Sequence, residues 1–143
     1  MTFEEWEETV PREIRDDSLW KLQAYRLGLF FADLAWADSA KLLKDRRTVR
    51  IAGQLMGAVG GISSTLSEGY SRNTGRERAR FYEYSLGSAR ESRDWYYQTR
   101  QLLGPSVTQL RLKLATRIIK LLLKMIPDQR RRNQKLSGEE PIT

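Results

Sequence analysis

The chain has 143 residues, enough for one domain with its own core, and it is 40% hydrophobic and 30% charged. It carries a net charge of +7 and contains no histidine and no cysteine. The commonest general base, the commonest metal ligand and the thiolate nucleophile are therefore missing. We expect no catalytic residues, no metal site and no cofactor. The acidic start and the lack of a long apolar run predict a cytoplasmic protein without a membrane span.

The charges of the chain are concentrated in separate segments. Residues 1–17 hold seven acidic and two basic residues, whereas the rest carries a net charge of +12. Such a body attracts polyanions, although a charged surface also simply keeps a protein soluble. In the acidic segment, Phe3 and Trp6 lie along one side of a short helix that Pro11 ends. We interpret 1–17 as an acidic amphipathic arm that docks through these two aromatic residues.

Four longer amphipathic helices are expected after the arm. The first is expected from 18 to about 43, the third from about 75 to 103 and the fourth from 107 to 126. The second follows a turn over 44–48 and ends near Gly69. The connections between them are short, and no stretch alternates apolar and polar residues as a strand would. This pattern predicts an all-α fold, an antiparallel up-and-down four-helix bundle over 18–126.

Capping and breaking residues set these predicted bounds. Ser18 is expected to cap the first helix, and Thr74 with Glu77 forms a capping box for the third. Gly69 is expected to terminate the second helix, and Pro127 the fourth. Residues 127–143 contain too few apolar residues to fold alone, so they are predicted to form a flexible basic tail.

The second helix carries a row of small residues opposite its apolar face. Gly53, Gly57, Gly61 and Ser64 follow one another at spacings of four and three. Each interior glycine costs about 0.5–1 kcal/mol relative to alanine, so packing must hold this helix. Two explanations stay open, a close crossing with the small-residue face of the third helix or a face used between subunits.

The fourth helix has an apolar arc that covers well over half of its circumference, more than a surface helix needs. Leu112, Ile119, Leu123 and Ile126 lie towards one flank of this arc, and we expect them to be buried between subunits. The remaining arc is a row of positive charge, and no acidic residue occurs between Pro105 and Pro127. This row is either a solvated face or a phosphate-binding surface.

Two motifs and an aromatic first helix make the chain similar to a known family. The first motif runs from Ile62 through Leu66-Ser67-Glu68-Gly69-Tyr70. The second runs from Phe81 through Ser85-Leu86-Gly87-Ser88-Ala89-Arg90-Glu91. They resemble, over about 19–126, the four-helix-bundle proteins encoded by intervening sequences in large-subunit ribosomal RNA genes. The accessory variability proteins of diversity-generating retroelements are similar to that family.

The resemblance implies a ring-like homopentamer with no established catalytic activity and a nucleic-acid or ribonucleoprotein role. The family residues carried over to this chain are Glu68, Gly69, Gly87, Ser88 and Glu91. The usual proline and asparagine of the first motif are replaced here by Ser63 and Thr65. Any role tied to those two residues is not carried over.

We therefore expect a non-catalytic oligomer that binds RNA or DNA through phosphates, with a reverse transcriptase as a candidate protein partner. The alternative is a scaffold whose basic surface binds an acidic protein partner. Glu68 and Glu91 are expected to cap helices or to pair with arginines inside the bundle. The expected nucleic-acid-binding residues are Arg72, Arg76, Arg78, Arg80, Lys113, Arg117, Lys120, Lys124, Arg130, Arg131 and Arg132.

Overall fold

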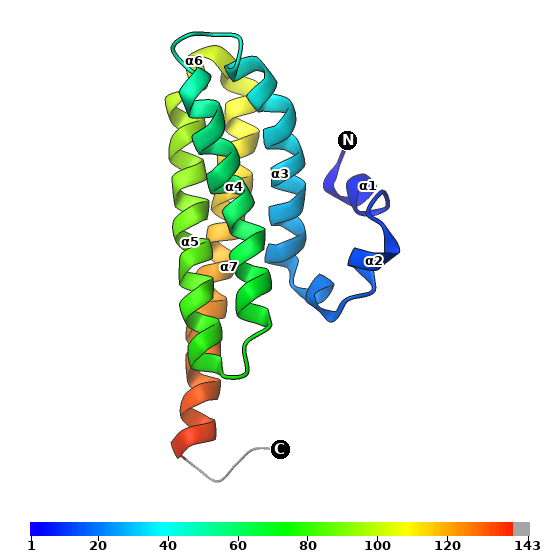
Figure 1. Ribbon diagram of the computed structural model, residues 1–143, viewed down its shortest axis with the longest axis vertical. Coiled ribbons are helices and arrows are strands. Elements are labelled where there is room, and N and C mark those ends of the chain that lie inside the picture. The colour runs from blue at the N-terminus through cyan, green and yellow to red at the C-terminus, as the bar shows by residue number, and fades with distance from the viewer. Residues whose placement is uncertain (139–143) are drawn as a thin grey trace.

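A computed structural model describes residues 1–138 of the chain, and the surroundings of side chains up to residue 132. Over this range the chain contains helices and no strand. The four long helices are α3 (Gln23–Leu42), α4 (Val49–Tyr70), α5 (Gly75–Gln98) and α7 (Pro105–Gly138). They alternate in direction and pack side by side (Figure 1). The predicted antiparallel four-helix bundle is confirmed.

The core is formed where the apolar faces of these helices meet. Phe31 of α3 stacks on Tyr96 of α5, with ring centroids 5.5 Å apart. Leu55, Val59 and Ile62 of α4 are fully buried, as are Ile118 and Leu122 of α7. The spacing of these residues follows the helical repeat, which is why the apolar pattern located the helices well.

A buried polar network joins three of the helices. The hydroxyl of Tyr96 donates to Asp38 Oδ2 at 2.6 Å, and Arg111 Nε donates to the same oxygen at 2.7 Å. A second bond runs from Arg111 Nη2 to Asp38 Oδ1 at 3.2 Å. Burial and the neighbouring Asp38 carboxylate both raise the pKa of the Tyr96 phenol, so this hydroxyl stays protonated and donates. These charge-assisted hydrogen bonds fix the register of α3, α5 and α7 relative to one another.

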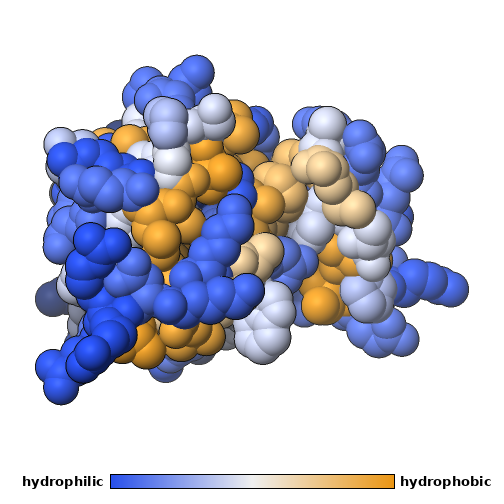
Figure 2. All heavy atoms as spheres, turned by 90° about the horizontal axis from the view of Figure 1, so that it is seen from above, coloured by the Kyte–Doolittle hydropathy of each residue, from blue (hydrophilic) through white to orange (hydrophobic). Residues whose placement is uncertain are grey.

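The arm docks on α3 of its own chain. It contains α1 (Phe3–Glu7) and α2 (Arg12–Arg15), and the 3-10 turn η1 (Ser18–Lys21) joins it to α3. Trp6 is buried between Trp20 and Phe30, and its indole Nε1 donates to Asp33 Oδ2 at 2.7 Å. Viewed from above, the arm is a lobe beside the bundle with hydrophilic residues along its outer edge (Figure 2). The expected aromatic docking therefore occurs, and its receptor is α3.

The first bundle helix begins later than predicted. Asp17 caps the 3-10 turn by accepting a bond from the Leu19 amide at 2.9 Å. Leu22 is then extended, with ψ at 111°, and α3 starts at Gln23. The prediction that Ser18 caps one continuous helix is wrong, because the chain must turn at Leu22 for the arm to fold back on α3.

Glycines of α4 serve two different purposes. A Cβ on Gly61 would lie 2.7 Å from Ser88 Oγ of α5, so the predicted close crossing exists at this position. Gly69 lies inside α4 rather than at its end, and a Cβ there would lie 2.7 Å from Phe81 Cβ. Its predicted role as a terminator is wrong, because the residue makes room for α5. Around Gly53 and Gly57, by contrast, a Cβ would meet nothing within 4 Å.

Thr74 caps α5 as predicted, accepting a bond from the Glu77 amide at 3.1 Å. The expected third helix is interrupted at Thr99, and its last part is the short α6 (Arg100–Leu103). Gly104, at a φ of 88°, makes the turn into α7. Pro105 is the first residue of α7, a position where the missing amide hydrogen costs nothing.

The last helix does not end at Pro127, so that prediction is wrong. α7 continues to Gly138 with Pro127 inside it. The proline leaves the carbonyl of Leu123 without its helical partner, but both residues are exposed, so water can bond that carbonyl. Beyond it, Arg130 Nη2 contacts Glu83 Oε2 of α5 at 2.5 Å. Residues 139–143 of the predicted tail lie outside the described part of the chain.

Most of the wide apolar arc of α7 is covered within the chain. Ile119 and Ile126 are only 4% and 5% exposed, whereas Leu123 is 47% exposed. The reason is that α7 packs against α3, α5 and α6 at once, which buries a broader arc than one neighbour could. The expectation that Ile119 and Ile126 face another subunit is therefore wrong.

Candidate nucleic-acid interface

A row of four cations runs along the outer face of α7. Lys113, Arg117, Lys120 and Lys124 follow at spacings of four, three and four, and all four are exposed. None of them forms an ion pair with any residue up to Arg132. We call this set the α7 row. Their charges are thus available to an external anion.

The helix beyond Pro127 lengthens this face. Arg131 follows Lys124 by seven residues and therefore lies on the same side of α7, where it is exposed. It pairs with Asp128 one turn earlier. At a rise of about 1.5 Å per residue, the face from Lys113 to Arg131 is about 27 Å long.

Two arginine groups that are distant in the sequence meet at the end of the bundle opposite α6. One surrounds the α4–α5 connection and the other follows Pro127 on α7, and these two segments lie at the same end of the bundle in Figure 1. The Arg130–Glu83 contact joins the two groups. Burial raises the pKa of Tyr82, while Arg78 and Arg132 act on it in the opposite direction, so both groups lie near this ring. We call this set the arginine end. Its members are Arg72, Arg76, Arg78, Arg80, Arg130, Arg131 and Arg132.

Aromatic rings hold three of these arginines in place. The guanidinium of Arg72 lies 4.6 Å from the ring centroid of Phe81, and that of Arg78 lies 5.2 Å from Tyr70. Arg80 lies over Tyr84 and also donates to its hydroxyl at 3.0 Å. Glu77, Glu83 and Asp128 each contact an arginine here, so the arginine end is partly neutralised while the α7 row is not.

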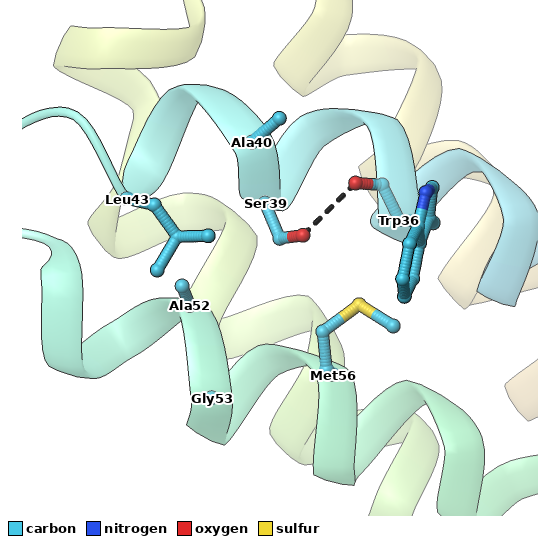
Figure 3. A pocket seen from close by; sticks show the side chains of 7 residues that line it. All are labelled: Trp36, Ser39, Ala40, Leu43, Ala52, Gly53 and Met56. Carbon is cyan, nitrogen blue, oxygen red and sulfur yellow. Dashed lines mark hydrogen bonds between the residues drawn. The ribbon is translucent and has the colours of Figure 1, made fainter.

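An apolar groove lies on another side of the bundle, between α3 and α4. The indole of Trp36 and the thioether of Met56 face each other across it, and Leu43 points towards Ala52 (Figure 3). The groove has a volume of about 340 Å³, and Trp36 is 74% exposed. Gly53 adds no side chain to its wall. This surface carries no charge in its lining and differs in kind from the two basic surfaces.

The described residues contain neither a membrane-spanning helix nor a cluster of metal ligands. Up to Gly138, no helix is both long and apolar enough to cross a membrane. In the same part of the chain, no three acidic side chains are grouped as ligands for a metal ion.

Comparison with known proteins identifies the family. A family model described as 23S rRNA-intervening sequence protein matches residues 21–124. The chain belongs to this family. The match includes the whole α7 row but neither the arm nor Arg130, Arg131 and Arg132. No curated protein and no solved structure matches the chain, and none of the comparisons supports the likeness to retroelement accessory proteins.

The motif residues of the 23S rRNA-intervening sequence protein family have separate positions in the fold. Gly69 and Ser88 lie at the two close approaches of α4 and α5, whereas Gly87 is exposed. Glu68 is exposed and in no ion pair up to Arg132, and Glu91 accepts a bond from Trp95 Nε1 at 3.0 Å. Neither pairs with an arginine inside the bundle, so that expectation is wrong. The Gly61–Ser88 and Gly69–Phe81 contacts align α4 with α5. In this alignment Glu68 and Glu91 are separated along the bundle axis by about nine helical residues, or roughly 13 Å.

Sequence reasoning missed two further polar features. The first is the Asp38–Tyr96–Arg111 network, whose members lie 58 and 73 residues apart and share no motif. The second is Tyr97, which is 53% exposed and has the guanidinium of Arg100 4.0 Å from its ring centroid. An aromatic residue followed three positions later by arginine was the available signal for this pair.

Proposed function

We propose that this protein is a non-catalytic RNA-binding protein that contacts phosphates through the α7 row, with the arginine end as a second contact surface. The observation that carries the proposal is the α7 row itself, four exposed cations without a carboxylate partner up to Arg132. The family supplies the link to RNA, since its description names an rRNA-intervening sequence. A cytoplasmic location is part of the proposal.

The acidic-partner alternative and the reverse-transcriptase role are weaker. An acidic protein would need a shaped contact surface, whereas the α7 row presents its charges in a line along one helix, as a phosphate backbone does. Neither the fold nor the family match favours a reverse transcriptase or DNA as the partner. RNA is therefore the polyanion that we propose.

Replacing Lys113, Arg117, Lys120 and Lys124 together with glutamine should weaken RNA binding and its salt dependence. Each phosphate contact contributes roughly 0.7 to the slope of log affinity against log salt for a single strand, so four lost contacts flatten it by about three units. Fluorescence anisotropy with labelled RNA over a salt series measures this slope.

A matched variant separates position from overall charge. Replacing Lys41, Lys44, Arg46 and Arg50 with glutamine removes the same charge from exposed positions around the α3–α4 connection. We expect this variant to keep nearly the wild-type slope. Equal slopes in the two variants would mean that RNA binds by net charge alone and that the α7 row is not the site.

We also propose that the chain assembles into a homo-oligomer, with five subunits as the family resemblance implies. Trp36 is 74% exposed beside the apolar groove, and Gly53 and Gly57 lie on a bare face of α4. Interior glycines weaken a helix, and close packing of another backbone against them can offset this cost. A second copy of the chain would provide such packing.

Light scattering at low micromolar concentration should therefore give a mass five times that of the 16.7 kDa chain. A mass of two or four chains would support contact between subunits through this face but would contradict a pentamer. A species of 16.7 kDa would rule out the oligomer.

A further inference from the structure

A shallow groove follows α7, and only its first part is also bordered by α5 and α6. One part of about 370 Å³ is lined by Tyr97, Arg100, Thr108 and Gln109, and the next part of about 350 Å³ by Gln109, Lys113, Arg117 and Lys120. The two parts share Gln109 and Leu112, so one ligand can occupy both. No carboxylate lines either part. We call it the α5–α7 groove.

The two parts offer different chemistry. At one end the guanidinium of Arg100 lies over the ring of Tyr97, 4.0 Å from its centroid, and its Nη1 also donates to the Tyr97 carbonyl at 3.0 Å. This pair is a preformed stacking platform at a half-exposed position. At the other end, three members of the α7 row follow along the helix at rises of about 6 and 4.5 Å. Arg93 of α5 adds a cation at this wall through its bond to Thr116, at 3.2 Å.

One polar group in the groove lacks a partner. Thr108 is 5% exposed, and its hydroxyl makes no hydrogen bond with any described residue. A buried hydroxyl without a partner is costly, and such groups in native proteins usually have a ligand or water to bond. Thr108 lines the groove between the stacking platform and the start of the α7 row, but its hydroxyl oxygen is covered, so a base edge reaches it only when a neighbouring side chain moves.

Resting on the RNA-binding function proposed above, we propose that the α5–α7 groove binds a single-stranded RNA segment. One unpaired base stacks on the Tyr97–Arg100 pair, its edge faces Thr108, and the following phosphates lie against Lys113, Arg117 and Lys120. The interior of a duplex does not fit this arrangement, because the faces of its bases are covered by their neighbours. Stacking on aromatic rings with phosphates on a cationic row is a general way to hold a single strand with little sequence preference.

Tyr97→Leu tests the stacking platform. The probes are a short unstructured polyuridine RNA and a blunt RNA duplex of the same length, each measured by fluorescence anisotropy over a salt series. Loss of one stacked base should weaken polyuridine binding about 5- to 150-fold. The salt slope should stay unchanged because no charge is removed. Duplex binding should also stay unchanged, and Tyr97→Phe should bind polyuridine like the wild type.

Tyr84→Leu is the matched control. Tyr84 is 47% exposed and also has an arginine over its ring, but it lies at the arginine end and not in the α5–α7 groove. Because Tyr84 holds Arg80 at the second contact surface, this variant should weaken polyuridine and duplex binding to the same small extent. Loss of affinity for polyuridine alone in Tyr84→Leu, with none in Tyr97→Leu, would move the stacking site to the arginine end and overturn the proposal.

The remaining outcomes distinguish this inference from the function on which it rests. Wild-type affinity in Tyr97→Leu, or an equal loss for polyuridine and duplex, would overturn the α5–α7 groove while leaving RNA binding intact. Failure of the wild-type protein to bind either RNA would overturn both. Because Tyr97 is half-exposed, the variant should fold, and an unchanged thermal unfolding curve by circular dichroism checks this.

Discussion

Replacing Asp38 with alanine should lower the free energy of unfolding by about 3–5 kcal/mol, because it leaves a guanidinium buried without its counter-charge. The side chains of Asp38 and Arg111 are only 5% and 13% exposed, so water cannot replace the lost carboxylate well. Tyr96 loses its acceptor in the same step. Urea unfolding followed by far-ultraviolet circular dichroism, at one protein concentration, measures the change.

Two further variants show whether the buried charge is the cause. Asp94→Ala removes an exposed carboxylate and should stay within about 0.5 kcal/mol of the wild type. Asp38→Leu combined with Arg111→Leu removes both charges and should recover much of the loss, since a buried pair can often be replaced by apolar residues. A cost below about 1 kcal/mol for Asp38→Ala would mean that the network is not buried as described.

Ile119→Asp should leave most of the chain unfolded at 25 °C. Removing a buried isoleucine costs about 2–5 kcal/mol, and the buried carboxylate adds to it, against a total stability of about 5–15 kcal/mol for a typical domain. Far-ultraviolet circular dichroism should show a large loss of helix and no cooperative thermal transition. A normally folded Ile119→Asp protein would mean that α7 is rotated from the setting described here.

Leu123→Asp is the comparison on the same helix. Its side chain is 47% exposed, so the variant should keep its helical signal and lose no more than about 1 kcal/mol. In light scattering it also reports on assembly. A folded Leu123→Asp protein of reduced mass would place the subunit contact on α7, and an unchanged mass would leave the groove beside Trp36 as the contact.

The bundle itself could be predicted because its signals are local. The spacing of apolar residues located all four long helices, and Thr74 capped α5 where the capping box placed it. The failures arose where tertiary contacts outweigh local preference. Pro127 breaks isolated helices, but here its affected carbonyl faces solvent and the next turn is held by Glu83. Glycine often ends a helix, but Gly69 lies inside α4, because Phe81 of α5 comes too close to leave room for a side chain there.

Less of the candidate site could be predicted than of the fold. The four cations of the α7 row are exposed on one face as their spacing indicated. Their neighbours across the groove could not be derived, because the pairing of α7 with Tyr97 and Arg100 depends on the turn at Gly104 and on which face of α5 meets α7. Because the helix pairing was unknown, the sequence also could not show which apolar residues of α7 face the core.

Anchoring of the acidic arm keeps its negative charge apart from the cations of α7. The arm is fixed to α3 by the Trp6–Asp33 bond and by the Glu7–Arg26 contact at 2.6 Å, on the side of the bundle away from α5 (Figure 1). Its net charge of −5 is therefore held at one side, while the unpaired cations of the α7 row lie on another helix. In the field of a polyanion such a particle turns before it makes contact, so that encounters begin on the cationic side and become less oriented as salt is added.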